Sequence, residues 1–101
     1  MAVDVDVKID EKIKKEIAKP PMYKVVFLND DQTPMDFVIG LLESIFHHSF
    51  ETAKQITLTV HTEGSAVVGY YTFEVAEQKS FEAITMSRNH GFPLQIKLEQ
   101  E

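Results

Sequence analysis

The sequence predicts a small α+β sandwich, in which three helices pack on one face of a three-stranded antiparallel sheet in the order β-α-α-β-α-β. Two observations lead to this fold. Apolar residues follow strand spacing in three short segments and helix spacing in three longer ones, and polar or glycine-containing turns separate the segments. The chain has 101 residues, which is enough for one domain with a modest core.

The first strand leads through a polar turn into the first helix. Residues 23–28 are rich in Val and aromatic residues, as strands are, and residues 29–32 form a turn whose side chains can bond their own backbone. We expect Thr33 to be the N-cap of the helix and Pro34 its first residue. One face of this helix is apolar and carries Phe37, Val38, Leu41, Leu42, Ile45 and Phe46.

A second helix and a second strand follow. Ser49 can cap the helix, and Gly64 is a natural stop. One side of this helix carries Ala53, Ile56, Thr57, Val60 and His61. Residues 65–71 are predicted to form the second strand.

A third helix and a last strand complete the domain. The helix is predicted to begin after Thr72, its N-cap, and to run to about Asn89, where Gly91 and Pro93 end it. Alternation of apolar and polar residues over 94–98 predicts the last strand. No internal repeat or low-complexity tract interrupts this order.

Residues 1–20 are expected to be a flexible tail, and residues 21–101 the folded domain. Apolar residues alternate over 3–9 as in a strand, whereas Ile13 and Ile17 lie one helical turn apart, so the local signals conflict. Because the segment has so little to bury, we expect only transient structure in it. The pair of prolines that follows ends the tail, since each proline lacks a backbone donor.

Composition argues against several kinds of partner. The formal net charge of −6 argues against nucleic acid, because phosphate-binding surfaces need clustered Lys and Arg. The same charge favours a cationic or amine-bearing partner. No apolar run approaches the ~20 residues of a membrane span, so no membrane partner is expected. The chain has no Cys and lacks the apolar core of a secretory signal, so we expect a cytosolic location and no disulfide.

Catalysis and metal binding find little support in the sequence. His47 and His48 are neighbours that point in different directions from a helix, and His61 and His90 have no partner at metal-ligand spacing. There is no G-x-S-x-G elbow and no Gly-rich phosphate loop. We therefore expect no enzyme, no metal and no cofactor.

The turn after the first strand offers acceptors for a cation. Asn29 has a carbonyl, Asp31 a carboxylate and His61 a ring nitrogen if neutral. Three acceptors that meet at one point suit an ammonium group, which carries three donors. If the first two helices pack together, a small apolar hole beside these acceptors would be lined by Thr33, Met35, Val38, Thr57 and Val60. The alternative is that these residues simply belong to the core.

Several motifs carry a resemblance to a known family. Residues 28–35 read Leu-Asn-Asp-Asp-Gln-Thr-Pro-Met, residues 60–61 read Val-His, and residues 72–77 read Thr-Phe-Glu-Val-Ala-Glu. With Pro93-Leu94 near the end, they resemble the hallmark segments of ClpS adaptors in unbroken register over residues 20–99, and motifs of this length are specific. The resemblance implies a small α/β adaptor that binds the N-terminal residue of substrate proteins and hands them to a Clp AAA+ protease.

The resemblance also implies roles for single residues. The substrate's free α-amino group would be held by Asn29, Asp31 and His61. Its large hydrophobic or aromatic first side chain would enter a pocket lined by Leu28, Thr33, Met35, Val38, Thr57, Val60 and Leu94. A surface that docks on the N-terminal domain of a ClpA-type unfoldase would include Glu74, Glu77 and Lys79. The tail would take part in delivery, and we expect a monomer.

One position departs from the family pattern. Most members have Met where this chain has Thr57, and that Met narrows the pocket together with the Met that matches Met35. This departure does not change the expectation that the protein binds N-terminal residues, but it puts the family's usual selectivity for the first residue in doubt.

Two other function classes stay open from the residues alone. One is a plain interaction domain that uses a face of the sandwich and binds no N-terminus. The other is a metal-dependent enzyme that uses His61 with Asp30 or Asp31.

Overall fold

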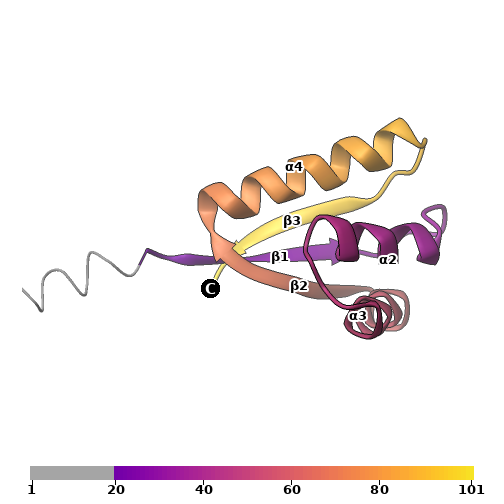
Figure 1. Ribbon diagram of the computed structural model, residues 1–101, viewed down its shortest axis with the longest axis horizontal. Helices are drawn as coiled ribbons and strands as arrows, with labels where there is room; N and C mark the ends of the chain where they lie inside the picture. The colour runs from indigo at the N-terminus through magenta and orange to yellow at the C-terminus, as the bar shows by residue number, and fades with distance from the viewer. Residues whose placement is uncertain (1–19) are drawn as a thin grey trace, which may run out of the picture.

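The computed structural model of the chain describes residues 20–101. Its elements are β1 (Met22–Leu28), α2 (Met35–Ser44), α3 (Phe50–Glu63), β2 (Ser65–Thr72), α4 (Phe73–Asn89) and β3 (Gln95–Gln100) (Figure 1). This confirms the predicted order. The tail expected over residues 1–20 lies, apart from Pro20, outside the described residues. Within residues 20–101, no helix is both long and apolar enough to span a membrane.

The three strands form one sheet with β1 in the centre. The order is β2-β1-β3, and both pairings are antiparallel. Val25 lies opposite Gly69 on β2, whereas Val26 lies opposite Val67, so the register shifts between these two pairs. Val68 is therefore the extra residue of a β-bulge. The Val68 carbonyl accepts a hydrogen bond from Nε2 of His48 at 2.6 Å, so the loop between α2 and α3 is fastened to β2.

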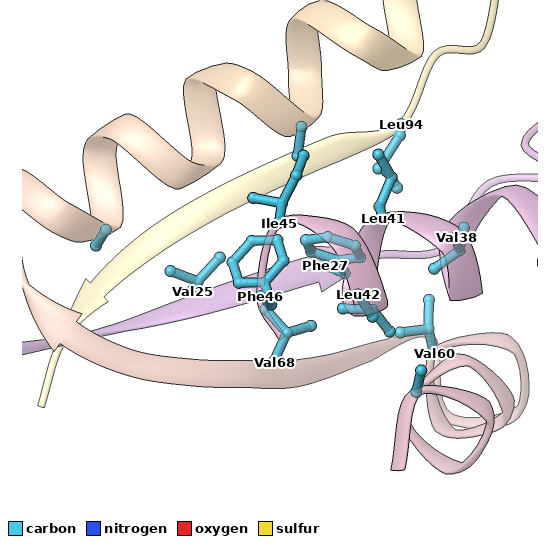
Figure 2. Packing of buried hydrophobic residues seen from close by; sticks show 13 residues of the cluster. Val25, Phe27, Val38, Leu41, Leu42, Ile45, Phe46, Val60, Val68 and Leu94 are labelled. Atoms are coloured by element: carbon cyan, nitrogen blue, oxygen red, sulfur yellow. The ribbon is translucent and has the colours of Figure 1, made fainter. Parts of the chain in front are cut away.

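The core lies between the sheet and the helices (Figure 2). Alternation along β1 sends Val25 and Phe27, both fully buried, toward the helices. α2 contributes Leu41 and Leu42 to the same cluster. α4 faces the sheet with small buried side chains, namely Ala76, Ser80, Ala83 and Ser87, which allow its backbone to approach closely. The α+β sandwich expected from the sequence is therefore the observed fold.

The start of α2 differs from the prediction. The helix begins at Met35, and Pro34 is the N-cap, with an extended backbone at φ −65° and ψ 145°. Thr33 does not cap the helix, because its hydroxyl bonds to the carboxylate of Asp30. The proline still suits this position, since it lacks the N–H that the helix start would leave without a partner.

The other predicted helix ends are largely confirmed. Ser49 accepts a hydrogen bond from the backbone N–H of Thr52 at the start of α3. Gly64 ends α3 with a left-handed backbone, φ 91°, which a residue with a Cβ adopts only under strain. Thr72 occupies the N-cap position of α4 as predicted, but its side chain makes no capping hydrogen bond.

Candidate functional site

A cavity of about 320 Å³ opens between the loop after β1, the start of α2 and the second half of α3. Its lining residues are Asn29, Asp30, Asp31, Thr33, Pro34, Met35, Val38, Thr57, Val60 and His61. They include every residue that the sequence assigned to amine or side-chain binding except Leu28 and Leu94. The cavity is thus made of polar loop residues on one side and largely apolar helix residues on the other.

Strand pairing explains why the loop and α3 meet here. Leu28 at the end of β1 pairs with Ser65 at the start of β2. The ladder continues one step further, since the backbone N–H of Asn29 donates to the carbonyl of Gly64 at 2.9 Å. Gly64 is the C-cap of α3, and His61 lies one turn earlier on that helix. The pairing therefore holds Asn29 close to the helix end that carries His61.

Asp30 fixes the shape of the loop. Its carboxylate accepts hydrogen bonds from the backbone N–H groups of Gln32 and Thr33 at 2.8 and 2.7 Å. It also accepts the Thr33 hydroxyl at 2.8 Å. Burial by itself raises the pKa of Asp30, but the bonds from Thr33 and Gln32, aided by the charge of Arg88, bring the pKa below its ordinary value of 3.8. The ionised carboxylate of Asp30 therefore holds the loop in shape, and its two oxygens already accept hydrogen bonds from the loop itself.

The helix side of the cavity offers little to a polar ligand. Val38, Val60 and Thr57 are at most 6% exposed. The Thr57 hydroxyl donates to the carbonyl of Ala53 at 2.8 Å, one turn earlier in α3. Because the Thr33 hydroxyl is taken by Asp30, neither threonine has a free proton to donate to a ligand. Met35 is 38% exposed and borders the opening.

The polar edge of the cavity, here called the rim, consists of Asn29, Asp31 and His61. All three side chains are exposed. No side-chain hydrogen bond or ion pair found within residues 20–101 uses any of them, in contrast to Asp30. The rim therefore offers a carboxylate, an amide carbonyl and an imidazole at the mouth of an apolar cavity. This arrangement can bind a group that joins a cation with several donors to an apolar side chain.

Two residues expected in the pocket, Leu28 and Leu94, are not among the residues that line the cavity. Leu28 follows Phe27, whose side chain is in the core, so alternation along β1 places Leu28 on the opposite face of the sheet. Leu94 is 1% exposed and belongs to the hydrophobic core. Conversely, Asp30 and Pro34 line the cavity without having been assigned to it. The Asp-x-x-Thr spacing was a usable signal for Asp30, because an Asp in a turn often bonds the residues that follow it.

The three residues expected at an unfoldase surface all lie on α4. Glu74 and Glu77 are exposed. Lys79 is half-buried, and its Nζ donates to the carbonyl of Ile45 at 2.8 Å. The ammonium also lies 5.5 Å from the ring centroid of Tyr71, a cation–π distance. α4 contributes no residue to the cavity, so the two groups of residues lie on separate parts of the domain.

A metal centre has no basis in the described part of the chain. Within residues 20–101, no group of three or more His, Cys, Asp or Glu side chains is placed to hold a metal ion. His48 is engaged with the Val68 carbonyl, and Nδ1 of His90 lies 2.9 Å from the Met86 carbonyl, so both rings have partners within the chain.

Comparison with known proteins gives concordant matches. The family profile described as ATP-dependent Clp protease adaptor protein ClpS matches residues 18–97. An ATP-dependent Clp protease adapter protein ClpS of Treponema denticola is 44% identical over 88 residues, which cover 87% of each protein. The protein of the same name from Rhodospirillum centenum is 47% identical over 90 residues, covering 89% of this chain and 83% of the relative.

A solved structure matches the fold as well. The structure of Agrobacterium tumefaciens ClpS2 bound to L-phenylalaninamide superposes with a TM-score of 0.79 and 41% sequence identity. The match covers 82% of this chain and 100% of that one. The ligand of that protein has a free α-amino group and an amide in place of its carboxylate, which are the features of the first residue of a peptide.

Proposed function

The chain belongs to the ClpS family of ATP-dependent Clp protease adaptor proteins, and on that premise we propose that it binds the free N-terminal residue of N-degron substrates and delivers them to a Clp AAA+ protease. The preferred first residue is large and hydrophobic or aromatic. In this role the chain catalyses no reaction itself and needs no cofactor. The observation that carries the proposal is the rim, whose acceptors have no partner among residues 20–101, at the mouth of an apolar cavity of about 320 Å³.

The rim supplies recognition of the α-amino group. A protonated amine carries three N–H donors, and Asn29, Asp31 and His61 offer one acceptor each if the imidazole is neutral. The carboxylate of Asp31 also balances the positive charge. An internal residue of a polypeptide has an amide in place of the amine, with one donor and no charge. The rim therefore distinguishes a chain end from an internal residue.

The cavity supplies recognition of the side chain. Its volume falls in the ~300–1,000 Å³ range of small-ligand pockets. Val38, Val60 and the two threonines give a wall without free hydroxyl protons, so a polar side chain entering it would leave its own acceptors without donors. An apolar side chain has no hydrogen bonds to lose in the cavity, and its transfer out of water lowers the free energy. The cavity therefore favours large apolar first residues.

Delivery requires a second contact, with the protease. We assign this contact to Glu74, Glu77 and Lys79 on α4 and to the N-terminal domain of a ClpA-type unfoldase. The segment preceding the domain takes part in handing over the substrate. The proposal includes a cytosolic monomer that contacts neither nucleic acid nor membrane. Sedimentation of the purified protein tests the monomer.

A peptide series tests the binding function. Fluorescently labelled peptides that differ only in their first residue are titrated with the protein, each with a free and an acetylated N-terminus. We expect Phe, Leu, Tyr and Trp to bind, Asp and Gly to bind at least about tenfold more weakly, and acetylation to abolish binding. Equal binding of the acetylated peptides would leave a plain interaction domain as the better explanation.

A further inference from the structure

A groove runs along α4 on the side that faces the end of α2. It consists of two neighbouring cavities of about 360 and 290 Å³, which share Ile45 and Glu82. Lys79 lines the first cavity, and Phe81 and Met86 line the second. No residue of the groove also lines the substrate cavity. In Figure 1, α4 and α3 lie at opposite edges of the molecule with α2 between them.

The groove and the adjoining side of α4 carry large exposed apolar side chains. Phe81 is 69% exposed, Val75 43% and Met86 41%. The buried residues of α4 lie on the opposite side of the helix, where Ala76 and Ala83 face the sheet. Packing against the sheet therefore does not account for Phe81 or Met86. Large apolar side chains gathered on one exposed helix surface are typical of a contact site for another protein.

The surroundings of these apolar residues are acidic. Glu74, Glu77 and Phe81 follow each other at i, i+3 and i+7, so they share one stripe of the helix, and exposed Glu82 stands beside it. The single ion pair found within residues 20–101 joins Lys97 and Glu99, both on β3. Two cations lie on the same helix, and both are engaged by backbone carbonyls: Lys79 donates to Ile45, and Arg88 donates to Phe92 and Leu94. The stripe thus presents carboxylates without ion-pair partners in the described part of the chain.

We propose that Phe81 and Met86 are apolar anchors of a docking surface along α4, for a protein partner that brings an apolar contact surrounded by Lys or Arg. The identity of this partner, the Clp unfoldase, rests on the proposed function, in which Glu74 and Glu77 already belong to the docking surface. Phe81 lies one helical turn beyond Glu77 and continues that surface toward the C-terminal end of α4. Groove and substrate cavity share no residue, so a partner docked in the groove covers none of the residues that line the substrate cavity.

A matched pair of Phe variants tests the anchor. The full chain, labelled with a fluorophore, is titrated with the cognate Clp unfoldase as wild type, Phe81→Ser and Phe50→Ser. Phe50 is the control, since it is 53% exposed but lies at the start of α3. We expect Phe81→Ser to weaken binding at least about tenfold and Phe50→Ser by no more than about twofold. Both variants should bind a Phe-initiated peptide as the wild type does, which shows that the fold and the cavity are intact.

The outcomes separate this inference from the function it rests on. Equal unfoldase binding by wild type and Phe81→Ser, or an equal loss in both variants, overturns the inference and leaves the adaptor function standing. A wild-type chain that binds neither the unfoldase nor a Phe-initiated peptide contradicts the proposed function itself. If sedimentation shows that the wild type is a dimer and that Phe81→Ser dissociates it, the surface joins two copies of this chain, and the assignment to an unfoldase is wrong.

Discussion

Replacing Thr57 with Met is expected to change which first residues the cavity accepts. Thr57 is 2% exposed and lines the cavity, so a longer side chain at this position has no route to solvent except through that space. The hydrogen bond from its hydroxyl to the Ala53 carbonyl holds the threonine in one rotamer. A methionine extends two heavy atoms further than Thr57, and these atoms would occupy room that a ligand now uses.

The size of the effect follows from the volume at stake. One methylene more or less in a packed apolar pocket changes discrimination between ligands by ~1–3 kcal/mol, which is roughly 10- to 200-fold. First residues branched at Cβ, such as Ile and Val, place their second branch next to the wall, whereas Leu and Phe branch further along. We therefore expect the wild type to bind Ile-initiated peptides within about tenfold of Leu-initiated ones. Thr57→Met should increase that ratio at least about tenfold.

The assay compares four peptides and three proteins. Leu-, Phe-, Ile- and Val-initiated peptides are titrated with the wild type, Thr57→Met and Thr57→Val. The valine variant keeps the shape of threonine and loses only its hydroxyl, so its preferences should match the wild type. A wild type that rejects Ile a hundredfold or more would show that Thr57 does not widen the cavity. The same conclusion would follow if Met35 moved into the space, since methionine adapts readily to its neighbours.

Three further predictions concern the loop, the rim and the tail. Asp31→Ala and His61→Ala should each weaken binding of a Phe-initiated peptide at least about tenfold, because each removes one of the acceptors for the substrate's ammonium group, and isothermal calorimetry can measure the loss. Asp30→Ala should weaken binding less but lower the free energy of unfolding by about 1 kcal/mol at neutral pH, since the loop loses the hydrogen bonds to the Asp30 carboxylate. The pKa of Asp30 in the folded state lies below its ordinary value of 3.8, so this contribution is complete above that pH and should be lost as the pH falls through the folded-state pKa. A difference between wild type and variant that stays the same as the pH is lowered would count against this role of Asp30. Deleting residues 1–18 should leave peptide affinity nearly unchanged and prevent degradation of a Phe-initiated reporter by the Clp protease, and equal degradation rates would refute a role for the tail in delivery.

Much of the fold could be predicted because local signals and packing agree. Ser49 and Gly64 mark the ends of α3 with side-chain and backbone preferences that no tertiary contact opposes. Thr33 was misassigned because two acceptable roles compete for the same hydroxyl. A threonine before Pro-Met looks like a helix cap, but the carboxylate of Asp30, three residues earlier, offers a charged acceptor, which forms the stronger bond. The bulge at Val68 had no local signal, since it depends on the register between two strands.

The sequence could likewise predict some parts of the candidate site and not others. The sequence could suggest that Asn29, Asp31 and His61 gather, but the closeness of loop and helix depends on the β1–β2 pairing and on the bond from Asn29 to Gly64. The resemblance assigned Leu28 to the pocket by position alone, whereas alternation with the buried Phe27 turns its side chain to the other face of the sheet. The exposure of Phe81 could not be derived from spacing alone, because only the packed structure shows which side of α4 faces the sheet.

Chemical-shift mapping with L-phenylalaninamide tests the central claim most directly. The two-dimensional amide spectrum of the full chain is recorded as the ligand is added, and again with N-acetyl-L-phenylalaninamide. If the free N-terminal residue binds in the cavity, saturable shifts will gather in residues 29–38 and 57–64 with the first ligand and be absent with the second. Shifts that gather on α4 instead, or that are equal for both ligands, would contradict the account.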